Sequence, residues 1–589
     1  MIGIHTFIRL SNNSFKDNRE TLDKEEWHEL ETVIDSERNA LFITKHISYP
    51  IIHWEINDYV IVFEGAIFNF KEREVRVRLE EIVKGGIEDS DIDRFVLDCD
   101  GDYIVTIKNK ESGETFIFND ILGNIPLNYY YSDNLFVASR SLSYIAVSLP
   151  QLEISQYNLA ENLTIDYNLL DHTIFKGLHQ TMPAQEIKTK IVNGVVETEI
   201  RTTYSHNFEV TNPYKNKIEA AKDLARIFIK ACQERVEYAN EHGYEIVNTM
   251  SGGFDSRTVL GGLDKFTHDF LNVTYEYIQD ESEVARAVLD KVGSKSEFVK
   301  FSYENKPDYT DDRLTFITDG KINCYTNSVC YHDLKYGYEK YFMRKKVLYF
   351  GGFGGEFIRH PYFPSVWNRN NISKRFLSPS LDDICDVLGV REKGNMHRIH
   401  NLFKTIESPT NEAYCKKLYS EYYTKYVRGA GEERMRLFYF TTQPLMAKDF
   451  ILAARNRIPL RWCGYRFYKM FLAYINPALN EVGVYGNRPN IHSLLSLLYN
   501  DYYQKGTVIN KLIYRRLENR HKRYKRDPLY DARLLGNYID SCKGIFTHLN
   551  NRFVLENYST LGTNFQNKIL AFLQYIKMIL VYRGTTTLS

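Results

Sequence analysis

The sequence predicts an α/β protein with at least two domains, in which a layered, strand-rich front domain precedes a doubly wound parallel sheet. The first observation is length, because 589 residues exceed what one hydrophobic core usually organises. The second is that residues 1 to about 205 read as short alternating strands between turns, as at residues 59–63, 103–107 and 115–118. The third is an alternation of strands and helices after residue 245, which implies parallel pairing.

In the middle of the chain this alternation can be followed element by element. Strands are expected at residues 246–250, 270–277, 296–301 and 347–350, and helices at residues 258–263 and 281–292. A doubly wound sheet binds its ligands at the carboxyl ends of the strands. The loop after the first of these strands lies in that position.

That loop has the composition of a phosphate-binding turn, with the sequence S-G-G-F-D-S-R at residues 251–257. Gly252 and Gly253 let the backbone turn sharply and approach a ligand, and the start of a helix adds N–H groups and a positive dipole end. Ser251 and Ser256 add hydroxyl donors. A carboxylate and phosphates repel each other unless a hard cation lies between them. The presence of Asp255 in this loop therefore predicts that ATP binds together with Mg²⁺.

Two simpler interpretations stand beside this one. In the first, the whole loop is only a Ser/Gly turn before an ordinary helix. In the second, Arg257 faces solvent rather than the phosphates. The loop is not the G-x-x-x-x-G-K-S/T motif of common nucleotide hydrolases, since no lysine closes it. S-G-G-x-D-S resembles instead the pyrophosphate loop, or PP-loop, of enzymes that split ATP between its α and β phosphates.

Charge and cysteine usage argue against a nucleic-acid-binding protein, a membrane protein and a zinc site. Lys plus Arg equals Asp plus Glu at 75 each, so the net charge does not indicate nucleic acid or an anionic membrane surface. The 8 cysteines form no C-x-x-C pair, and no secretory leader or membrane-length apolar run is seen, so a cytoplasmic protein is expected. Cys324 and Cys330 lack histidine partners at ligand spacing and are expected to be structural thiols rather than zinc ligands.

Three pieces of the front third together resemble the glutaminase domain of asparagine synthetases, which belongs to the N-terminal-nucleophile (Ntn) amidohydrolases. They are G-A-I-F-N-F at residues 65–70, L-D-C-D-G-D-Y at 97–103, and N-D-I-L-G-N-I-P-L at 119–127 with F-V-A-S at 136–139. Residues 173–184 are similar to the family's T-I-F-x-G-I and P-G pair. The resemblance implies an Ntn-hydrolase-like fold that ends near residues 200–215.

The front domain departs from that family at its nucleophile. The family begins M-C-G-I, and its cysteine attacks glutamine with its own α-amine as base. Here the start is M-I-G-I, and Ile2 has no nucleophilic atom, so glutamine hydrolysis by that route is not expected. Asn69 takes the position of an oxyanion-hole side chain and is expected to be a structural remnant. Proteolysis that exposes Thr6 as a new N-terminal nucleophile is the alternative.

A second glycine-rich loop, G-G-F-G-G-E-F at residues 351–357, resembles the G-E-G-x-D-E-L/V-F loop of asparagine synthetases. The resemblance puts Glu356 where the family has a magnesium-binding aspartate, so Asp255 and Glu356 would share the cation while Gly354 and Gly355 line the ATP site. A solvated carboxylate in an ordinary turn is the simpler interpretation. Phe353 falls where the family has a glutamate, and a phenyl ring cannot transfer protons.

The last third carries weaker signals. Residues 443–450 resemble the family's R-x-P-F-L-D segment, with Ala447 in place of the aspartate. Either Arg466 or Lys469 takes the position of the family's charge-stabilising lysine, unless both lie on an ordinary amphipathic helix face. Residues 480–589 are expected to be helical, and the basic run at 511–526 suits an acidic partner or, more simply, a solvated helix face.

The resemblance divides the chain into a degenerate glutaminase-like domain (1–205), an asparagine-synthetase-like, PP-loop (HUP-like) ATP-binding domain (206–480) and a helical C-terminal extension (481–589). It implies an ATP-dependent carbon–nitrogen ligase with Asp255, Arg466 and Lys469 as catalytic residues. This ligase would adenylate the carboxylate of a small molecule or peptide and couple it to ammonia or a substrate amine, without a glutaminase of its own.

Relatives without the N-terminal cysteine include lasso-peptide cyclases, β-lactam synthetases and asparagine-synthase-like proteins of surface-polysaccharide clusters, and the sequence does not choose among them. The competing hypothesis is a non-catalytic binding or scaffold protein, which the losses at Ile2, Phe353 and Ala447 favour. The oligomeric state stays open, a homo-oligomer included.

Overall fold

The computed structural model describes residues 2–11, 15–22, 25–165, 167–275, 281–301, 312–320, 324–359, 410–421, 424, 429–483 and 563–584. The basic run at 511–526 lies outside these ranges, as do most residues of the expected C-terminal extension. Within the described part of the chain, Cys99, Cys232, Cys415 and Cys463 are buried free thiols. No helix in that part is both long and apolar enough to span a bilayer.

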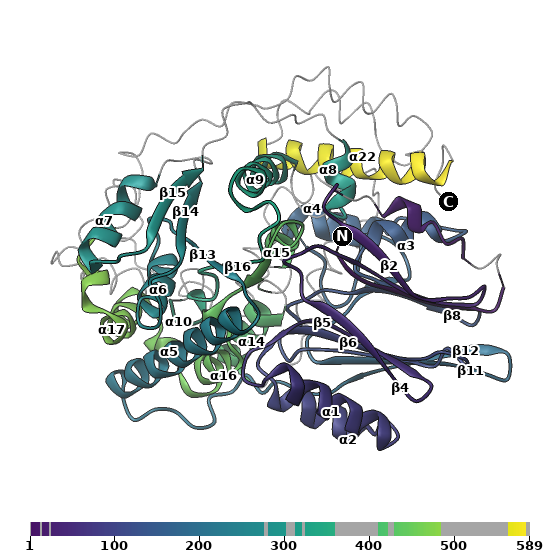
Figure 1. Ribbon diagram of the computed structural model, residues 1–589, viewed down its shortest axis with the longest axis horizontal. Helices are drawn as coiled ribbons and strands as arrows, with labels where there is room; N and C mark the ends of the chain where they lie inside the picture. The colour runs from purple at the N-terminus through teal and green to yellow at the C-terminus, as the bar shows by residue number, and fades with distance from the viewer. Residues whose placement is uncertain are drawn as a thin grey trace.

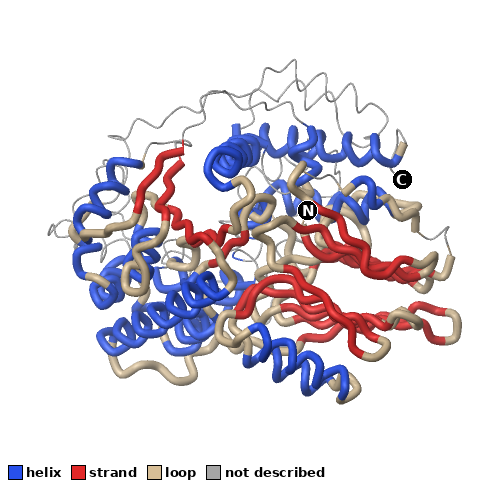
Figure 2. Tube along the Cα trace, viewed as in Figure 1, coloured by secondary structure: helices blue, strands red, loops and turns tan. Residues whose placement is uncertain are grey.

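The front domain is a sandwich of two antiparallel, six-stranded sheets, with helices on both outer faces (Figures 1 and 2). One sheet has the order β10-β8-β9-β1-β3-β2, with bounds Leu178–Gln180, Asn128–Ser132, Leu135–Ser139, Gly3–Arg9, Asn39–Lys45 and Glu29–Asp35. The other has the order β12-β11-β7-β6-β5-β4, with bounds Val195–Thr202, Gln185–Val192, Thr115–Asn119, Gly101–Asn109, Tyr59–Ile67 and Ile51–Ile56. Helices α1 (Glu72–Lys84) and α2 (Asp89–Asp98) cover the second sheet, while α3 (Leu142–Ser148) and α4 (Gln156–Ile165) lie over the first (Figure 1).

The central strands of this sandwich are apolar on both sides because each sheet is covered twice. Ile61 and Val105 are fully buried where β5 pairs with β6, and Phe42 is fully buried on β3. The strands predicted at 59–63, 103–107 and 115–118 are confirmed as parts of β5, β6 and β7. The layered domain expected from turn spacing is therefore present.

Beside it, on the left in Figure 1, lies a parallel, five-stranded sheet of order β15-β14-β13-β16-β17. Its strands are β13 (Glu245–Thr249), β14 (Leu271–Tyr275), β15 (Glu297–Phe301), β16 (Val347–Phe350) and β17 (Phe440–Thr442). Val247, Val273 and Leu348 are fully buried, as expected for parallel strands that helices cover on both faces. The four predicted strands of this region are confirmed, and β17 was not predicted.

The second domain also contains helices. They are α5 (Lys217–Glu241), α6 (Phe254–Leu263), α7 (Ser282–Val292), α8 (Asp312–Ile317), α9 (Cys324–Gly337), α10 (Glu356–Arg359), α14 (Asn411–Lys417), α15 (Gly429–Met435), α16 (Lys448–Arg457) and α17 (Tyr465–Ile475). Asn216 caps α5 by accepting hydrogen bonds from the N–H groups of Ile218 and Glu219, each 3.0 Å long. The helix predicted at 258–263 is α6, which begins four residues earlier because Gly253 already takes the extended conformation of an N-cap residue.

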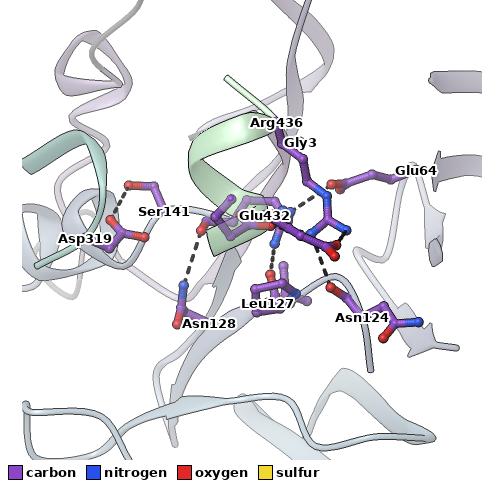
Figure 3. Close-up of polar contacts among 12 residues, drawn as sticks. Gly3, Glu64, Asn124, Leu127, Asn128, Ser141, Asp319, Glu432 and Arg436 are labelled. Atoms are coloured by element: carbon purple, nitrogen blue, oxygen red, sulfur yellow. Dashed lines mark hydrogen bonds and ion pairs between the residues drawn. The ribbon is translucent and has the colours of Figure 1, made fainter. Parts of the chain in front are cut away.

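The two domains and the last described helix are joined by buried polar contacts. Helix α22 (Thr563–Arg583) lies against α8, α3 and α9, and its Ile569, Phe572 and Leu580 are buried. Asp319, just after α8, accepts hydrogen bonds from the backbone N–H groups of Leu142 and Ser143, both 2.9 Å long. A carboxylate from the second domain thus caps α3 of the first (Figure 3).

Three histidines at the boundary between the domains are held in one neutral tautomer. His46 donates from Nε2 to the carbonyl of Arg436 (2.8 Å) and accepts at Nδ1 from the N–H of Ser48 (3.2 Å). His28 has the same arrangement with the carbonyl of Leu437 and the N–H of Glu25. His206 donates to the carbonyl of Ile121 and faces Arg455 through Nδ1. Protonation of any Nδ1 would break an accepted hydrogen bond.

Acidification is therefore expected to destabilise the protein between pH 6.5 and 4. Burial lowers the pKa of His46 to about 4 and, with help from Arg455, that of His206 to about 3. The unfolded chain takes up these protons first, so stability falls as pH falls. His46 alone should account for about 2 kcal/mol of the free energy of unfolding lost between pH 7.5 and 5. Urea unfolding of wild type and His46→Gln at both pH values measures it.

The control is His53→Gln, because His53 is exposed on β4. Wild type and the His53 variant should lose the same stability on acidification, whereas the His46 variant should lose less. An equal pH dependence in all three proteins would contradict the assignment of His46 as a buried neutral group.

Candidate functional site at the edge of the parallel sheet

The two glycine-rich loops are neighbours because the strands that precede them are neighbours. β13 pairs with β16 in parallel, with Val247 opposite Tyr349 and Asn248 opposite Phe350. The chain therefore leaves both strands at the same edge of the sheet, at Ser251 and at Gly351. Loops a hundred residues apart in the sequence meet there.

The first loop is closed by its own serines. The hydroxyls of Ser251 and Ser256 lie 3.0 Å apart, the N–H of Ser251 donates to the Ser256 hydroxyl (3.1 Å), and the N–H of Gly253 donates to the Ser251 hydroxyl (3.2 Å). The N–H of Gly252 donates to a carboxylate oxygen of Glu281, 2.7 Å away. An anion is thus bound at the loop by the amide of a glycine that the sequence assigned to phosphate binding.

Arg257 does something different from either predicted role. Its guanidinium is fully buried and donates to five carbonyl oxygens, those of Gly252, Gly253, Leu479, Val482 and Gly483. Burial lowers the pKa of Arg257 to about 10. The expectation of a solvent-facing arginine is wrong, and the side chain points back to fasten the loop to residues 479–483 rather than outward.

The glycines of the second loop are required by contact with the first. A Cβ atom on Gly352 would lie 2.6 Å from the backbone nitrogen of Ser256, and one on Gly355 would overlap the carboxylate of Asp255. Gly354 has φ +113°, which side chains rarely adopt. Gly352 and Gly355 therefore permit close packing of the two loops. The interpretation of Gly354 and Gly355 as part of an ordinary turn does not explain these contacts.

Asp255 and Glu356 lie together, joined by a residue that the sequence analysis missed. The guanidinium of Arg359 binds Asp255 through two hydrogen bonds of 3.1 and 3.0 Å, and its Nη2 atom also donates to Glu356 at 2.8 Å. All three side chains are largely buried, with exposed fractions of 12% for Arg359, 17% for Asp255 and 20% for Glu356. A solvated Glu356 is therefore not what the structure contains.

The local electrostatics are those of a crowded, partly desolvated cluster. Burial raises the pKa of Asp255 to about 6, with Arg359 opposing the shift and Glu356 adding to it. Burial alone would lower the pKa of Arg359, but the two carboxylates raise it above its usual value, so the guanidinium stays charged. Glu356 Oε2 and Arg359 Nε are buried without a hydrogen-bond partner among the described residues.

Helix α17 supplies aromatic side chains to this site. Arg359 lies over the rings of Tyr465 and Tyr468, 5.7 and 5.6 Å from their centroids, and the Tyr468 hydroxyl lies 2.9 Å from that of Thr258. Of the two cations predicted on this helix, Arg466 is exposed, and Lys469 is half-buried with a pKa that burial lowers. Their catalytic assignment stays a prediction.

Sequence reasoning had one signal for Arg359 and none for Tyr468. Arg359 stands three residues after Glu356, the spacing at which opposite charges meet on a helix. Tyr468 is one of 44 tyrosines and carries no motif. Phe353 is part of the second loop, and its N–H donates to the side chain of Gln443 (2.9 Å).

The front domain keeps a buried polar cluster at the start of β1 (Figure 3). Glu64 accepts a hydrogen bond from the N–H of Ile4 (3.0 Å) and from Arg140 Nε (2.8 Å), and a Cβ on Gly3 would overlap the Glu64 carboxylate. Ile2 is 3% exposed. The Glu64 carboxylate therefore lies directly beside Gly3 and Ile4.

The hydrogen bonds of Asn69 agree with the structural role that was expected for it. Its side chain donates to the carbonyl of Asp98 and accepts from the N–H of Asp100, both at 2.8 Å, so its hydrogen bonds hold the entry to β6. Thr6 is buried within β1, paired to β3 and β9, and donates its hydroxyl to the carbonyl of Ala40 (2.8 Å). The structure thus assigns Asn69 a structural role, and a threonine nucleophile would require the loss of paired strand residues.

From Glu64 the cluster crosses into the second domain. Arg140 also binds both carboxylate oxygens of Glu433 at 2.8 and 2.7 Å, and Arg436 pairs with Glu433 (2.6 Å) and Glu432 (3.0 Å). Arg436 reaches back to the carbonyl of Asn124 (3.2 Å) (Figure 3). None of these side chains is more than 4% exposed.

Comparisons with known proteins agree with this architecture. Residues 13–199 match the family model of a glutamine amidotransferase domain. The chain is 24% identical over 296 residues to the putative asparagine synthetase [glutamine-hydrolyzing] 2 of Methanocaldococcus jannaschii, covering 46% of this chain and 54% of that protein. It therefore spans about half the length of this curated relative.

Two solved structures align more loosely. A glutamine phosphoribosylpyrophosphate amidotransferase from B. subtilis, complexed with ADP and GMP, aligns with a TM-score of 0.22 and 9% identity over 51% of this chain and 65% of that chain. A structure of the allosteric regulatory enzyme of purine biosynthesis aligns with a TM-score of 0.22 and 8% identity over 63% and 77% of the two chains. Scores this low carry no inference.

The front of the chain is thus a glutamine-amidotransferase-type domain with a layered, Ntn-hydrolase-like fold. In this chain the domain precedes a parallel five-stranded sheet, and part of the chain is similar to a putative asparagine synthetase.

Proposed function

We propose that the protein is an ATP-dependent ligase that adenylates a carboxylate and then forms an amide with ammonia or a substrate amine. One observation carries the proposal: Asp255 and Glu356, from the ends of two adjacent parallel strands, meet beside a glycine-rich loop that already binds an anion. In open parallel sheets this edge is where ligands bind. The likeness to an asparagine synthetase supports the same chemistry.

The donor set at this edge is compatible with magnesium. Mg²⁺ bound to nucleotides commonly takes one or two protein carboxylates and completes its shell with phosphate oxygens and water. Asp255 and Glu356 supply two carboxylates, and Glu356 Oε2 is buried without a partner among the described residues. No group of three or more His, Cys, Asp or Glu side chains forms a metal site in that part of the chain. These residues therefore suit a cation that arrives together with ATP.

The proposed reaction has two displacement steps. A substrate carboxylate oxygen bonds to the α-phosphorus while the bond to the bridging oxygen breaks, and pyrophosphate leaves. An amine nitrogen then bonds to the acyl carbon, AMP leaves with the bonding electrons, and the nitrogen loses a proton. Magnesium, when bound, would neutralise the departing pyrophosphate. Phe353 has no group that could accept the amine's proton.

This chain's own residues would bind and orient the phosphates. The N–H of Gly252 now holds Glu281, so a phosphate oxygen would replace that carboxylate, and the Ser251 and Ser256 hydroxyls lie within the same turn. Arg257 holds the loop in shape through its five carbonyl contacts. Because Ile2 offers no nucleophile, the nitrogen would come from free ammonia or an amine-bearing substrate rather than from glutamine.

An exchange assay tests the proposal. Labelled pyrophosphate should be incorporated into ATP in the presence of Mg²⁺ and a panel of candidate acids, and Asp255→Asn should reduce exchange by roughly a hundredfold or more, because one of the two carboxylates facing the cation is lost. Asp269→Asn, an exposed site after α6, is the matched control and should exchange like wild type.

A binding or scaffold role is the second candidate, and one observation favours it. The guanidinium of Arg359 lies between the two carboxylates that a cation would share. Binding of ATP that is insensitive to Asp255→Asn, with no exchange for any acid, would support this candidate and contradict the ligase. Exchange that requires Asp255 would exclude it.

A further inference from the structure

Arg359 is built into the site rather than lying beside it. Its three hydrogen bonds of 2.8 to 3.1 Å span the two carboxylates, and the bidentate geometry toward Asp255 is the strongest form of such a pair. Its guanidinium rests on Tyr465 and Tyr468 of α17. The side chain is therefore fixed from two sides, by the carboxylates and by the aromatic rings.

The position of this guanidinium conflicts with a metal ion on the same oxygens. Nη2 contacts one oxygen of Asp255 and one of Glu356, so an ion that bridged these oxygens would occupy the space of Nη2. Even an ion held by Glu356 Oε2 alone would lie close to a positive charge in a poorly solvated place, where repulsion between cations is strong. Free divalent ions and Arg359 therefore compete for the two carboxylates.

Nucleotide phosphates would change that balance. Two carboxylates and one guanidinium carry a net charge of −1, and the phosphates of ATP add several negative charges to the same edge of the sheet. With those charges present, both a divalent ion and the guanidinium can be neutralised, since phosphate oxygens would replace the carboxylates as partners of Arg359. Its Nε, which is buried and has no partner among the described residues, is a donor available for that purpose.

We propose that Arg359 is an internal counter-cation that keeps divalent metal off Asp255 and Glu356 until nucleotide phosphates arrive. The inference rests on the proposed function, since it assumes that ATP binds at these loops. It assigns Arg359 as a positioning residue: the metal enters with the nucleotide and not before it. The ligand class is thus a metal–nucleotide complex rather than a free cation.

The test measures Mn²⁺ binding to the full-length protein by titration calorimetry and by the electron paramagnetic resonance signal of free Mn²⁺, without substrates. Wild type should bind Mn²⁺ weakly, and Arg359→Met should bind it roughly tenfold or more tightly, because a competing cation is gone. Arg359→Lys should lie between them, since one ammonium cannot span both carboxylates as a guanidinium does. Arg461→Met, at an exposed arginine just before α17, should match wild type.

The double variant Arg359→Met with Asp255→Asn locates the metal and should return to weak binding. With a non-hydrolysable ATP analogue, wild type should bind Mn²⁺ at least tenfold more tightly than without it. Equal Mn²⁺ affinity of wild type, Arg359→Met and Arg359→Lys would overturn the inference, as would tight Mn²⁺ binding by nucleotide-free wild type at Asp255.

Failure of the proposed function has a different signature. Tighter Mn²⁺ binding by Arg359→Met, without any effect of the ATP analogue on wild type, would support the competition between cations while contradicting ATP binding at this edge. Circular dichroism and the thermal midpoint show whether the methionine variant is folded. The lysine variant keeps a positive charge and serves as the measurement if it is not.

Discussion

Replacing Arg140 with methionine is expected to lower the free energy of unfolding by about 3–5 kcal/mol. Arg140 is 0% exposed and is the cation between Glu64 of the front domain and Glu433 of the second domain. Removing it leaves the buried Glu64 carboxylate without its cation, while Glu433 keeps only Arg436, and a buried charge that loses its partner costs far more than the pair contributed. The loss should appear in urea unfolding at pH 7.

Glu64 should reveal the same effect in a second way. Burial raises the pKa of Glu64 even with Arg140 in place, so without Arg140 the carboxyl should take up a proton, and adding Glu64→Gln to Arg140→Met should restore part of the stability. Arg78→Met is the control, because Arg78 and Asp98 form a pair with exposed fractions of 35% and 44%. It should change stability by less than about 1 kcal/mol. Equal losses in the buried and exposed variants would refute the expectation.

Replacing Lys108 with methionine should do the opposite and stabilise the protein. Lys108 is fully buried on β6, where its ammonium reaches only the Thr115 hydroxyl (3.0 Å) and the carbonyl of Phe7 (3.4 Å). No carboxylate forms an ion pair with it among the described residues. Burial lowers the pKa of Lys108 to about 7.

The sign and size of the effect follow from that pKa. The unfolded chain binds the proton more tightly, so between pH 7 and 10.5 stability rises with pH, and near pH 7 the wild type bears the full penalty. Methionine removes the penalty at similar volume, which should raise the free energy of unfolding by roughly 2–4 kcal/mol at pH 7. The gain should shrink to about 1 kcal/mol at pH 9.5.

Urea unfolding at the two pH values measures the gain. Lys110→Met is the matched control, because Lys110 lies one residue beyond β6 in an exposed pair with Glu55. A Lys108 variant that is no more stable than wild type at pH 7, or whose gain does not depend on pH, would show that the buried ammonium is solvated in a way that the hydrogen bonds do not reveal.

The sequence could predict that the two glycine-rich loops meet because the relevant signals are local. Asp255 stands at the start of a helix, and the strand, the turn and the helix start lie within about a dozen residues. Glu356 comes directly after a short apolar strand and a run of glycines. Parallel pairing then dictates that the two loops meet. The layered front domain was predictable for a similar reason, since alternation and turns report strands directly.

What could not be predicted depends on side-chain direction. Arg257 and Arg359 are both arginines near the loops, yet one binds five carbonyl groups and the other two carboxylates. Tertiary packing decides which of these groups an arginine binds, and the spacing of residues in the sequence does not show it. Glu64 is a further example, because it stands just before the motif at residues 65–70 and only the structure shows that its carboxylate binds the N–H of Ile4.

The cap that Asp319 places on α3 bears on how the molecule can be divided. A fragment cut near residue 205 would contain all the strands of the front sandwich, but the amides of Leu142 and Ser143 at the start of α3 would lose Asp319 as their acceptor. The boundary visible in the sequence therefore separates two topologies without separating two self-sufficient parts. Whoever wishes to isolate the front half should graft a substitute acceptor before that helix.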